Sequence, residues 1–182
     1  SDDFSFTPGT LLFSVGQVSK TFSVQITDDD ISEAPERFTI SLANATNASL
    51  TPASQEEIVI SDNEPLPSVT FSSSDTQSFS EGAGTLNVDI TLTQKYYQDV
   101  VVTITPSGQA MSGADYTLPA TVTIPALSQS ASFTLTGRED SIYEGSESVV
   151  LTHEEPAGLT RSTPFMVTHT LTDNETVPVL QF

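Results

Sequence analysis

The feature that most constrains the fold is an internal repeat at a fixed offset of 111 residues. The segment "TFSVQITDDDISEAPERFTISL" at 21–42 aligns with "SFTLTGREDSIYEGSESVVLTH" at 132–153, and "SDNE" at 61–64 aligns with "TDNE" at 172–175. A period of this length is typical of an array of domains rather than a solenoid of small repeats. We therefore predict the second half of one unit at 1–64, a complete unit at 65–176 and the first strand of a third unit at 177–182.

Apolar and polar residues alternate along most of the chain. In the segment 86–92, Leu86, Val88, Ile90 and Leu92 alternate with polar side chains, which is typical of half-buried antiparallel strands. Helix-period stretches are missing, and Gly, Pro, Asn and Asp fall between the apolar runs, as in "PSGQ" and "EEPAG". Many short strands joined by turns predict an all-β protein with the architecture of a β-sandwich.

The charge balance limits the possible partners. Five Lys or Arg stand against 24 Asp or Glu, for a formal charge of -19. Such a chain repels phosphate backbones and anionic lipid head groups, so we expect no nucleic-acid partner and no membrane insertion. Divalent cations are better candidates. With no Cys, thiolate metal sites and disulfides are excluded, and the isolated Asp75, Asp89 and Asp99 are predicted to be surface charges.

Catalysis finds little support in the sequence, so we predict that the chain is not an enzyme. No "GxSxG" segment, Gly-rich phosphate loop or Cys nucleophile is present, and a narrow sandwich offers no substrate cleft for paired carboxylates. His153 and His169 lie on alternating strands and are expected to face each other across the last hairpin as a buried pair, because a third metal ligand is lacking.

Acidic residues gather at the end of one predicted strand, in "TDDDISEAPERF" at 27–38. Asp28, Asp29 and Asp30 alone suit a solvated turn. Together with Glu33, Glu36 and Asp62, which the fold should bring to the same end, they suit a calcium site, since calcium takes six to eight oxygen ligands. In the complete unit, Arg138 adds a positive neighbour and Ser141 stands where Asp30 stands, so we expect that site to be weaker or to hold fewer ions.

Four spaced motifs occur in order: "FSEGAGTLNVDITL" at 79–92, "SGADY" at 112–116, "IYEGSE" at 142–147 and "TDNE" at 172–175. This order resembles the Calx-beta domain of sodium/calcium exchangers, an integrin cytoplasmic region and large repetitive bacterial surface proteins. The resemblance implies an immunoglobulin-like antiparallel β-sandwich of about seven strands per unit, with Ca²⁺ bound at one pole.

The resemblance also implies a set of metal ligands in each unit. In the complete unit they are Glu81, Asp115, Glu139, Asp140, Glu144, Glu147 and Asp173 with Asn174 or Glu175. In the half unit they are Asp3, Asp28, Asp29, Asp30, Glu33, Glu36 and Asp62. Within this sequence the half unit has no counterpart of Glu81.

The connection "SDNEPLPSVTF" contains two Pro and little slack, which predicts a stiff linker. Our leading expectation is a calcium-binding structural repeat of a large adhesin or filament at the cell surface or outside the cell, whose tandem array calcium stiffens. Its partners would be calcium and neighbouring repeats or identical subunits, head to tail. The alternatives are a regulatory calcium sensor, or a carbohydrate- or protein-binding module that uses an exposed hairpin tip at Tyr96 and Tyr97.

Residues 1–64 are expected to expose unpaired strand edges. Either the chain is a piece of a longer polypeptide, or neighbouring subunits supply strands, with "VPVLQF" at 177–182 as the natural donor. We favour a piece of a longer polypeptide, because that segment could supply only a first strand.

Overall fold

The protein is described by a computed structural model that covers residues 3–52, 54–72, 76–82 and 84–182. The chain divides into two compact units, Ser1–Asn63 (unit 1) and Glu64–Phe182 (unit 2). Every regular element of the described residues is a β-strand. In these residues no helix is long and apolar enough to cross a membrane. Asp89 and Asp99 are exposed, as predicted, whereas Asp75 lies outside the described residues.

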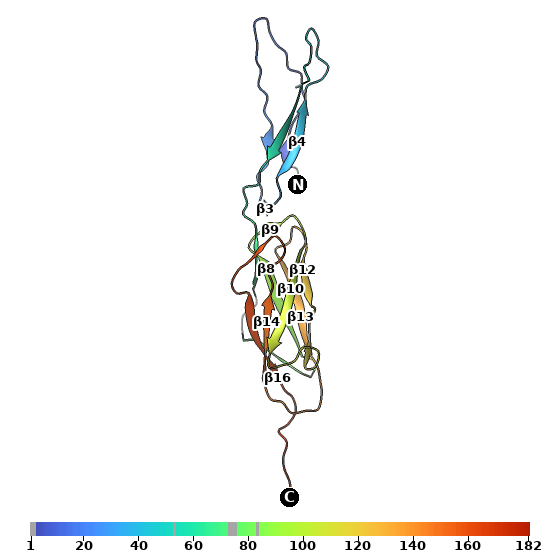
Figure 1. Ribbon diagram of the computed structural model, residues 1–182, viewed down its shortest axis with the longest axis vertical. Coiled ribbons are helices and arrows are strands. Elements are labelled where there is room, and N and C mark those ends of the chain that lie inside the picture. Colours follow the sequence, from blue (N-terminus) through green and yellow to red (C-terminus); the bar gives the residue numbers. More distant parts are fainter. Residues whose placement is uncertain (1–2, 53, 73–75, 83) are drawn as a thin grey trace. The chain divides into compact units, whose positions relative to one another are not determined.

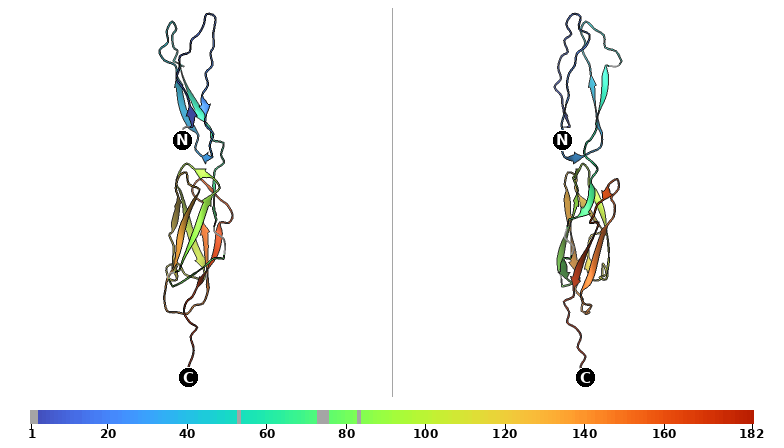
Figure 2. Two further views of the ribbon diagram at one scale, coloured as in Figure 1. Left: turned by 180° about the vertical axis from the view of Figure 1, so that it is seen from behind. Right: turned by 90° about the vertical axis from the view of Figure 1, so that its left-hand side faces the viewer.

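Unit 2 is a sandwich of two five-stranded sheets, with sheet orders β12-β10-β14-β16-β7 and β11-β13-β8-β6-β15 (Figures 1 and 2). The strands are β6 (Ser68–Phe71), β7 (Ser78–Ser80), β8 (Thr85–Leu92), β9 (Lys95–Tyr96), β10 (Val100–Gly108), β11 (Tyr116–Thr117), β12 (Thr121–Ile124), β13 (Ser130–Gly137), β14 (Glu147–His153), β15 (Thr160–Arg161) and β16 (Met166–Thr172).

Three strands of the sandwich are broken and contribute one piece to each sheet: β6 with β7, β11 with β12, and β15 with β16. Together with the unbroken β8, β10, β13 and β14 they account for the seven strands predicted per unit. The pairs β6–β15 and β7–β16 are parallel and the other pairs of the two sheets are antiparallel. The all-β sandwich expected from the alternation is therefore confirmed.

The core lies between the two sheets and follows the period-two pattern. Along β8, Val88 and Ile90 are fully buried, and the polar Asn87 and Asp89 are exposed. Val88 lies opposite Phe133 of β13, and Val102 and Val149 fill the other layer. Burial of such side chains stabilises the fold by about 1.5–3 kcal/mol each.

The two histidines are buried, but they do not face each other as expected. The strand register places His153 opposite Ile104 and His169 opposite Val149, so the two rings lie at different levels of β14 and β16. Both side chains are fully buried, and the His153 ring packs edge-on against Phe71 with 5.0 Å between ring centroids. The prediction was wrong because the register of the hairpin, and not the side-chain type, determines which residues lie opposite each other.

The tyrosines of the predicted hairpin tip also differ from the expectation. Tyr96 packs against the core of unit 2, and its ring lies 4.9 Å from that of Tyr97 in a T-shaped contact. Tyr96 therefore contributes to the packing of the sandwich rather than to a free contact surface.

Unit 1 contains β1 (Phe4–Ser5), β2 (Gln25–Ile26), β3 (Ile31–Ser32), β4 (Glu36–Ser41) and β5 (Gln55–Ile60). Its two antiparallel pairs repeat the register of unit 2. Phe4 lies opposite Ile26 as Tyr116 lies opposite Gly137, and Glu36 lies opposite Ile60 as Glu147 lies opposite Leu171. The internal repeat thus extends from the sequence to the hydrogen-bonding pattern.

Residues 177–182 form no strand, and the side chains of Val179 and Leu180 are 81% and 90% exposed. A strand needs a hydrogen-bonding neighbour, and the described residues offer none at this segment.

Candidate metal centre

Four segments of unit 2 meet at one pole of the sandwich because the strand register ends there. Strand β7 ends at Ser80, opposite Thr172 at the end of β16, while β14 begins at Glu147, opposite Leu171. Residues 81–82 follow β7, residues 109–115 follow β10, residues 138–146 precede β14 and residues 173–176 follow β16. The motifs that carry the predicted ligands therefore converge although they are far apart in the sequence.

The first carboxylate cluster consists of Glu81, Asp173 and Glu175, each with an oxygen within 4.8 Å of the others. The Glu81 side chain is only 1% exposed, and neither of its carboxylate oxygens has a hydrogen-bond partner among the described residues. Burial, followed by the charge of Asp173, raises the pKa of Glu81 from 4.5 to about 7. A buried carboxylate without a partner needs a proton or a cation nearby.

Asp173 differs from Glu81 in that its carboxylate accepts several hydrogen bonds from backbone N–H groups. Gly145 and Glu144 each donate a hydrogen bond to Oδ2 at 2.6 Å, and Glu175 donates one to Oδ1 at 2.7 Å. These bonds, with that of Gly145 the largest cause, lower the pKa of Asp173 to about 2. Asp173 therefore stays ionised, and its hydrogen bond with Glu175 raises the pKa of that residue.

The second cluster consists of Asp115, Glu144 and Glu147, again with ligand oxygens within 4.8 Å of one another. The backbone N–H of Met111 donates a 2.6 Å hydrogen bond to Asp115. Burial, followed by the charge of Asp115, raises the pKa values of Glu144 and Glu147. In the part of the chain that the structure describes, one carboxylate oxygen of Glu147 is buried without a hydrogen-bond partner.

Two further predicted ligands, Glu139 and Asp140, lie at the same pole but outside both clusters. Glu139 accepts hydrogen bonds from the Asn174 amide at 3.1 and 3.2 Å. Asp140 accepts one from the backbone N–H of Ile142 at 2.7 Å, and its charge contributes to the raised pKa of Glu81. The Arg138 guanidinium donates to the carbonyl of Gly113.

The acidic residues of unit 1 repeat this hydrogen-bonding pattern. Glu33 donates its N–H to Asp62 at 3.0 Å, as Glu144 does to Asp173. Ile31 donates its N–H to Asp29 at 2.9 Å, and the Asn63 amide donates to Asp28 at 3.2 Å. These bonds correspond to Ile142 with Asp140 and Asn174 with Glu139.

The carboxylates of unit 1 also lie close enough to affect one another. A hydrogen bond with Asp3 is the largest cause of the raised pKa of Glu36, and burial followed by the charge of Asp3 raises that of Glu33. Asp30 is exposed. Among the described residues, both clusters of three carboxylates belong to unit 2.

Sequence reasoning missed two features of the pole. The first is the set of backbone donors around Asp173, whose only signal is Gly145 in "YEGSE". The second is the close approach of β13 to the Glu81 segment: a Cβ on Gly137 would lie 2.1 Å from the Ser80 carbonyl oxygen and 2.9 Å from the Glu81 Cα. A glycine at the end of a strand indicates that another backbone segment can approach closely, but the sequence does not show which segment that is.

The pole suits a hard divalent cation with oxygen ligands. Two like charges about 4 Å apart repel by about 4 kcal/mol at an effective dielectric of 20, and each cluster brings three carboxylates together. Calcium takes six to eight oxygens in flexible geometry, whereas zinc favours nitrogen and sulfur ligands. The unpartnered oxygens of Glu81 and Glu147 fit calcium as the expected ion.

Comparisons with known proteins place the chain among relatives with this architecture. Human sodium/calcium exchanger 3 is 37% identical over 71 residues, which cover 39% of this chain and 8% of the exchanger. The crystal structure of the apo-form Calx CBD1 domain matches with a TM-score of 0.52 at 17% identity, over 60% of this chain and 99% of that one. CBD12 from CALX1.2 matches with a TM-score of 0.51 at 17% identity, over 58% of this chain and 44% of that one.

These structural likenesses show the fold, and the chain spans a small part of the exchanger's length. The family model of the Calx-beta domain matches residues 1–64 and 65–175. Because the two matched segments cover nearly the whole sequence and carry the motifs that form the acidic pole, the chain belongs to the Calx-beta domain family.

Proposed function

We propose that the chain is a calcium-responsive tandem of Calx-beta units, in which ion binding at the acidic pole orders the loops between the strands. The observation that carries this proposal is Glu81. Its carboxylate is buried, has no hydrogen-bond partner within the described ranges of the chain, and lies in a cluster with Asp173 and Glu175. Calcium as the cofactor agrees with both the family and the ligand chemistry.

The residues that would hold calcium are the two clusters, and the ion would supply the positive charge that they lack. Without the ion, Glu81 takes up a proton near neutral pH or repels Asp173. With the ion, segments 109–115 and 138–146 become tied to the strand ends through Asp115, Glu144 and Glu147. A ligand that binds only the ordered form stabilises that form by mass action.

A regulatory role is favoured over a purely structural one. The clusters join loops that connect different strands, so ion binding changes loop order rather than the sandwich core. The relatives also support this reading, because one is a sodium/calcium exchanger and another is the calcium binding domain CBD12 of CALX1.1. The family gives no indication of catalysis, and we propose a non-catalytic module.

A second candidate is the structural repeat of an adhesin or filament, outside the cell or at its surface. The repeated register of the two units supports it, because identical strand pairings at a fixed offset suit an array that extends by adding units head to tail. In this reading calcium would keep each pole rigid and would be bound at the millimolar levels found outside cells.

Isothermal titration of the full chain with calcium, and with magnesium as a control, tests both candidates. A sensor should bind calcium with a dissociation constant of about 10⁻⁷–10⁻⁵ M, and an extracellular structural module with about 10⁻⁴–10⁻³ M. Circular dichroism and small-angle scattering with calcium and with chelator then report the change in order. Absence of binding at millimolar calcium would refute both readings.

A further inference from the structure

Arg138 is a basic residue at the acidic pole of unit 2. Its guanidinium donates a hydrogen bond to the backbone carbonyl of Gly113, and its N–H donates one to the carbonyl of Asp115 at 2.8 Å. Both acceptors belong to the turn that carries the carboxylate of Asp115. Arg138 therefore holds this turn through its backbone and through its side chain.

The turn at residues 111–115 is also closed by hydrogen bonds of its own. The carboxylate of Asp115 accepts a bond from the N–H of Met111 at 2.6 Å, and the N–H of Asp115 donates to the Met111 carbonyl at 3.0 Å. These bonds hold the turn together. They do not attach it to Glu144 and Glu147, the other two carboxylates of its cluster.

The guanidinium of Arg138 does not act as a direct counter-charge for that cluster. In the part of the chain that the structure describes, it forms no ion pair with a carboxylate, and its hydrogen bond goes to a neutral carbonyl. Arg138 lies at the start of the segment 138–146, which carries Glu144 and leads into β14. Its side chain thus connects the two segments that supply the second cluster.

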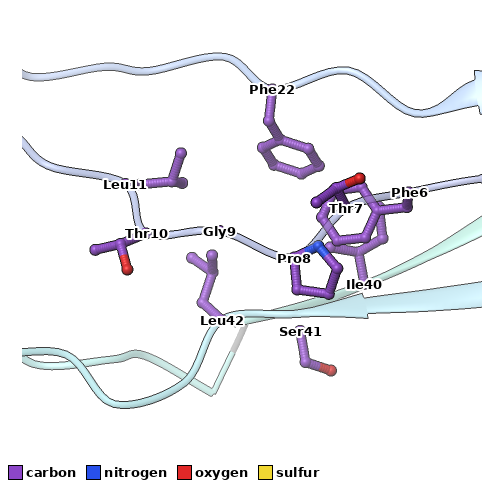
Figure 3. A pocket seen from close by; sticks show the side chains of 10 residues that line it. All are labelled: Phe6, Thr7, Pro8, Gly9, Thr10, Leu11, Phe22, Ile40, Ser41 and Leu42. Atoms are coloured by element: carbon purple, nitrogen blue, oxygen red, sulfur yellow. The ribbon is translucent and has the colours of Figure 1, made fainter.

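Unit 1 separates the two contacts of Arg138. Thr27 stands at the same repeat position, and its N–H donates to the Asp3 carbonyl at 2.8 Å, as the N–H of Arg138 does in unit 2. This bond continues the pair of β1 and β2, whose strands lead to Phe6 and Phe22 at the groove in Figure 3. The backbone bond is therefore part of a strand pairing that both units share, whereas the guanidinium contact is a feature of unit 2.

We propose that Arg138 is a positioning residue for calcium, whose side chain ties the Asp115 turn to the segment of Glu144 and so assembles the second cluster before the ion binds. A site whose ligands are already ordered loses less conformational entropy on binding. The role toward calcium rests on the proposed function, whereas the ordering of the turn in the metal-free protein does not. Charge alone would give the opposite effect, because a cation at the pole repels calcium.

The two effects differ in sign, so isothermal titration of the full chain with calcium separates them. Arg138→Met keeps a long side chain and removes both the charge and the hydrogen bond. Calcium should bind this variant about three- to tenfold more weakly than the wild type, the range that one net hydrogen bond supports. Tighter binding would show that Arg138 acts as a repelling charge, and tighter or unchanged binding would overturn the proposal.

Two further variants separate the hydrogen bond from the charge. Arg138→Lys keeps the charge and a flexible donor of similar reach, so it should bind calcium more tightly than Arg138→Met. Arg161→Met removes the same charge at the opposite end of β16 from the pole, where the guanidinium stacks on Phe165. Its affinity should stay within about twofold of the wild type, because solvent and salt screen so distant a charge. No rescue by lysine, or an equal loss in Arg161→Met, would contradict the tie.

Hydrogen exchange in chelator tests the ordering of the turn without calcium. The amide of Met111, which donates to the Asp115 carboxylate, should exchange at least about threefold faster in Arg138→Met than in the wild type. The buried amide of Val88 in β8 should exchange at the same rate in both proteins. Unchanged exchange at Met111 would overturn the ordering. A wild type that does not bind millimolar calcium would instead refute the proposed function and the role of Arg138 toward the ion.

Discussion

Replacing Glu81 with glutamine should make the metal-free protein more stable and the calcium-bound protein less stable. Glutamine keeps the shape of the side chain and removes a buried negative charge that has no hydrogen-bond partner in the residues the structure describes. In unit 2 the pKa of Glu81 rises from 4.5 to about 7 on folding. A shift of this size corresponds to at most about 3 kcal/mol of destabilisation when the group is ionised. Solvent next to the pole screens part of it, leaving about 2 kcal/mol.

The sign of the pH dependence follows from the raised pKa. Below pH 4.5 the carboxyl group is protonated in the folded and the unfolded protein, so the substitution has little effect there. Between pH 4.5 and about 7 only the unfolded state loses the proton readily, and the stability of the wild type falls. Above pH 7 the full penalty applies, and glutamine removes it.

Calcium should reverse the order of the two proteins. An ion at a hundred times its dissociation constant stabilises the folded state by about 2.7 kcal/mol, and glutamine lacks the charge that the ion needs. Scanning calorimetry at pH 8 should place unfolding of unit 2 about 8 °C higher for Glu81→Gln than for the wild type in chelator, at about 4 °C per kcal/mol. In excess calcium the wild type should unfold at the higher temperature.

The matched control is Glu155→Gln, which removes a charge from an exposed residue after β14, at the opposite end of that strand from Glu147. It should change neither the metal-free stability nor the calcium response appreciably. Two results would contradict the role of Glu81: destabilisation of the metal-free protein by Glu81→Gln at pH 8, or a variant that keeps the full calcium-dependent rise in unfolding temperature.

Three further experiments probe the pole and the core by substitution. Asp173→Asn should weaken calcium binding by at least about tenfold, because it removes a carboxylate that three backbone N–H groups keep ionised. Isothermal titration measures the loss of affinity. An unchanged affinity would show that Asp173 is not a ligand. Gly137→Ala should lower the free energy of unfolding by about 1–3 kcal/mol and weaken calcium binding, since its Cβ would lie 2.1 Å from the Ser80 carbonyl oxygen. Urea unfolding measures the change in stability. Gly9→Ala is the neutral control, because no atom of the described residues lies within 4 Å of the added Cβ. Leu151→Ala should cost about 2–5 kcal/mol in urea unfolding. Ile40→Ala at the same repeat position should cost clearly less, because Ile40 is only half-buried. Equal costs would contradict this difference in burial between the two positions.

Sequence patterns predicted the strands well because the alternation of apolar and polar residues is a local property. The spacing of Leu86, Val88 and Ile90 predicts a half-buried strand without any knowledge of which strands pair with it. Register is not local, and for that reason the expected contact between His153 and His169 was wrong. The same limit applies to Tyr96, whose packing against the core depends on contacts with distant strands.

The candidate ligands could be named from sequence, but their division into groups could not. In the sequence, Glu81, Glu139 and Asp173 are all acidic residues of predicted loops, and nothing distinguishes their environments. In the structure Glu81 is buried without a partner, Asp173 is held ionised by backbone donors, and Glu139 is bonded to Asn174 outside both clusters. These differences arise because four segments, separated by whole strands, meet at one pole.

By itself the sequence determined the repeat, the strand class and the acidic character of the loops, since each is written in the order and spacing of the residues. Only the tertiary structure decided which carboxylates converge and which apolar residues stay uncovered. Phe22 and Phe133 occupy the same repeat position, yet among the described residues only Phe133 is buried, with β8 paired beside it in the sheet. Burial depends on what lies across the sheet, and that neighbour comes from another part of the chain.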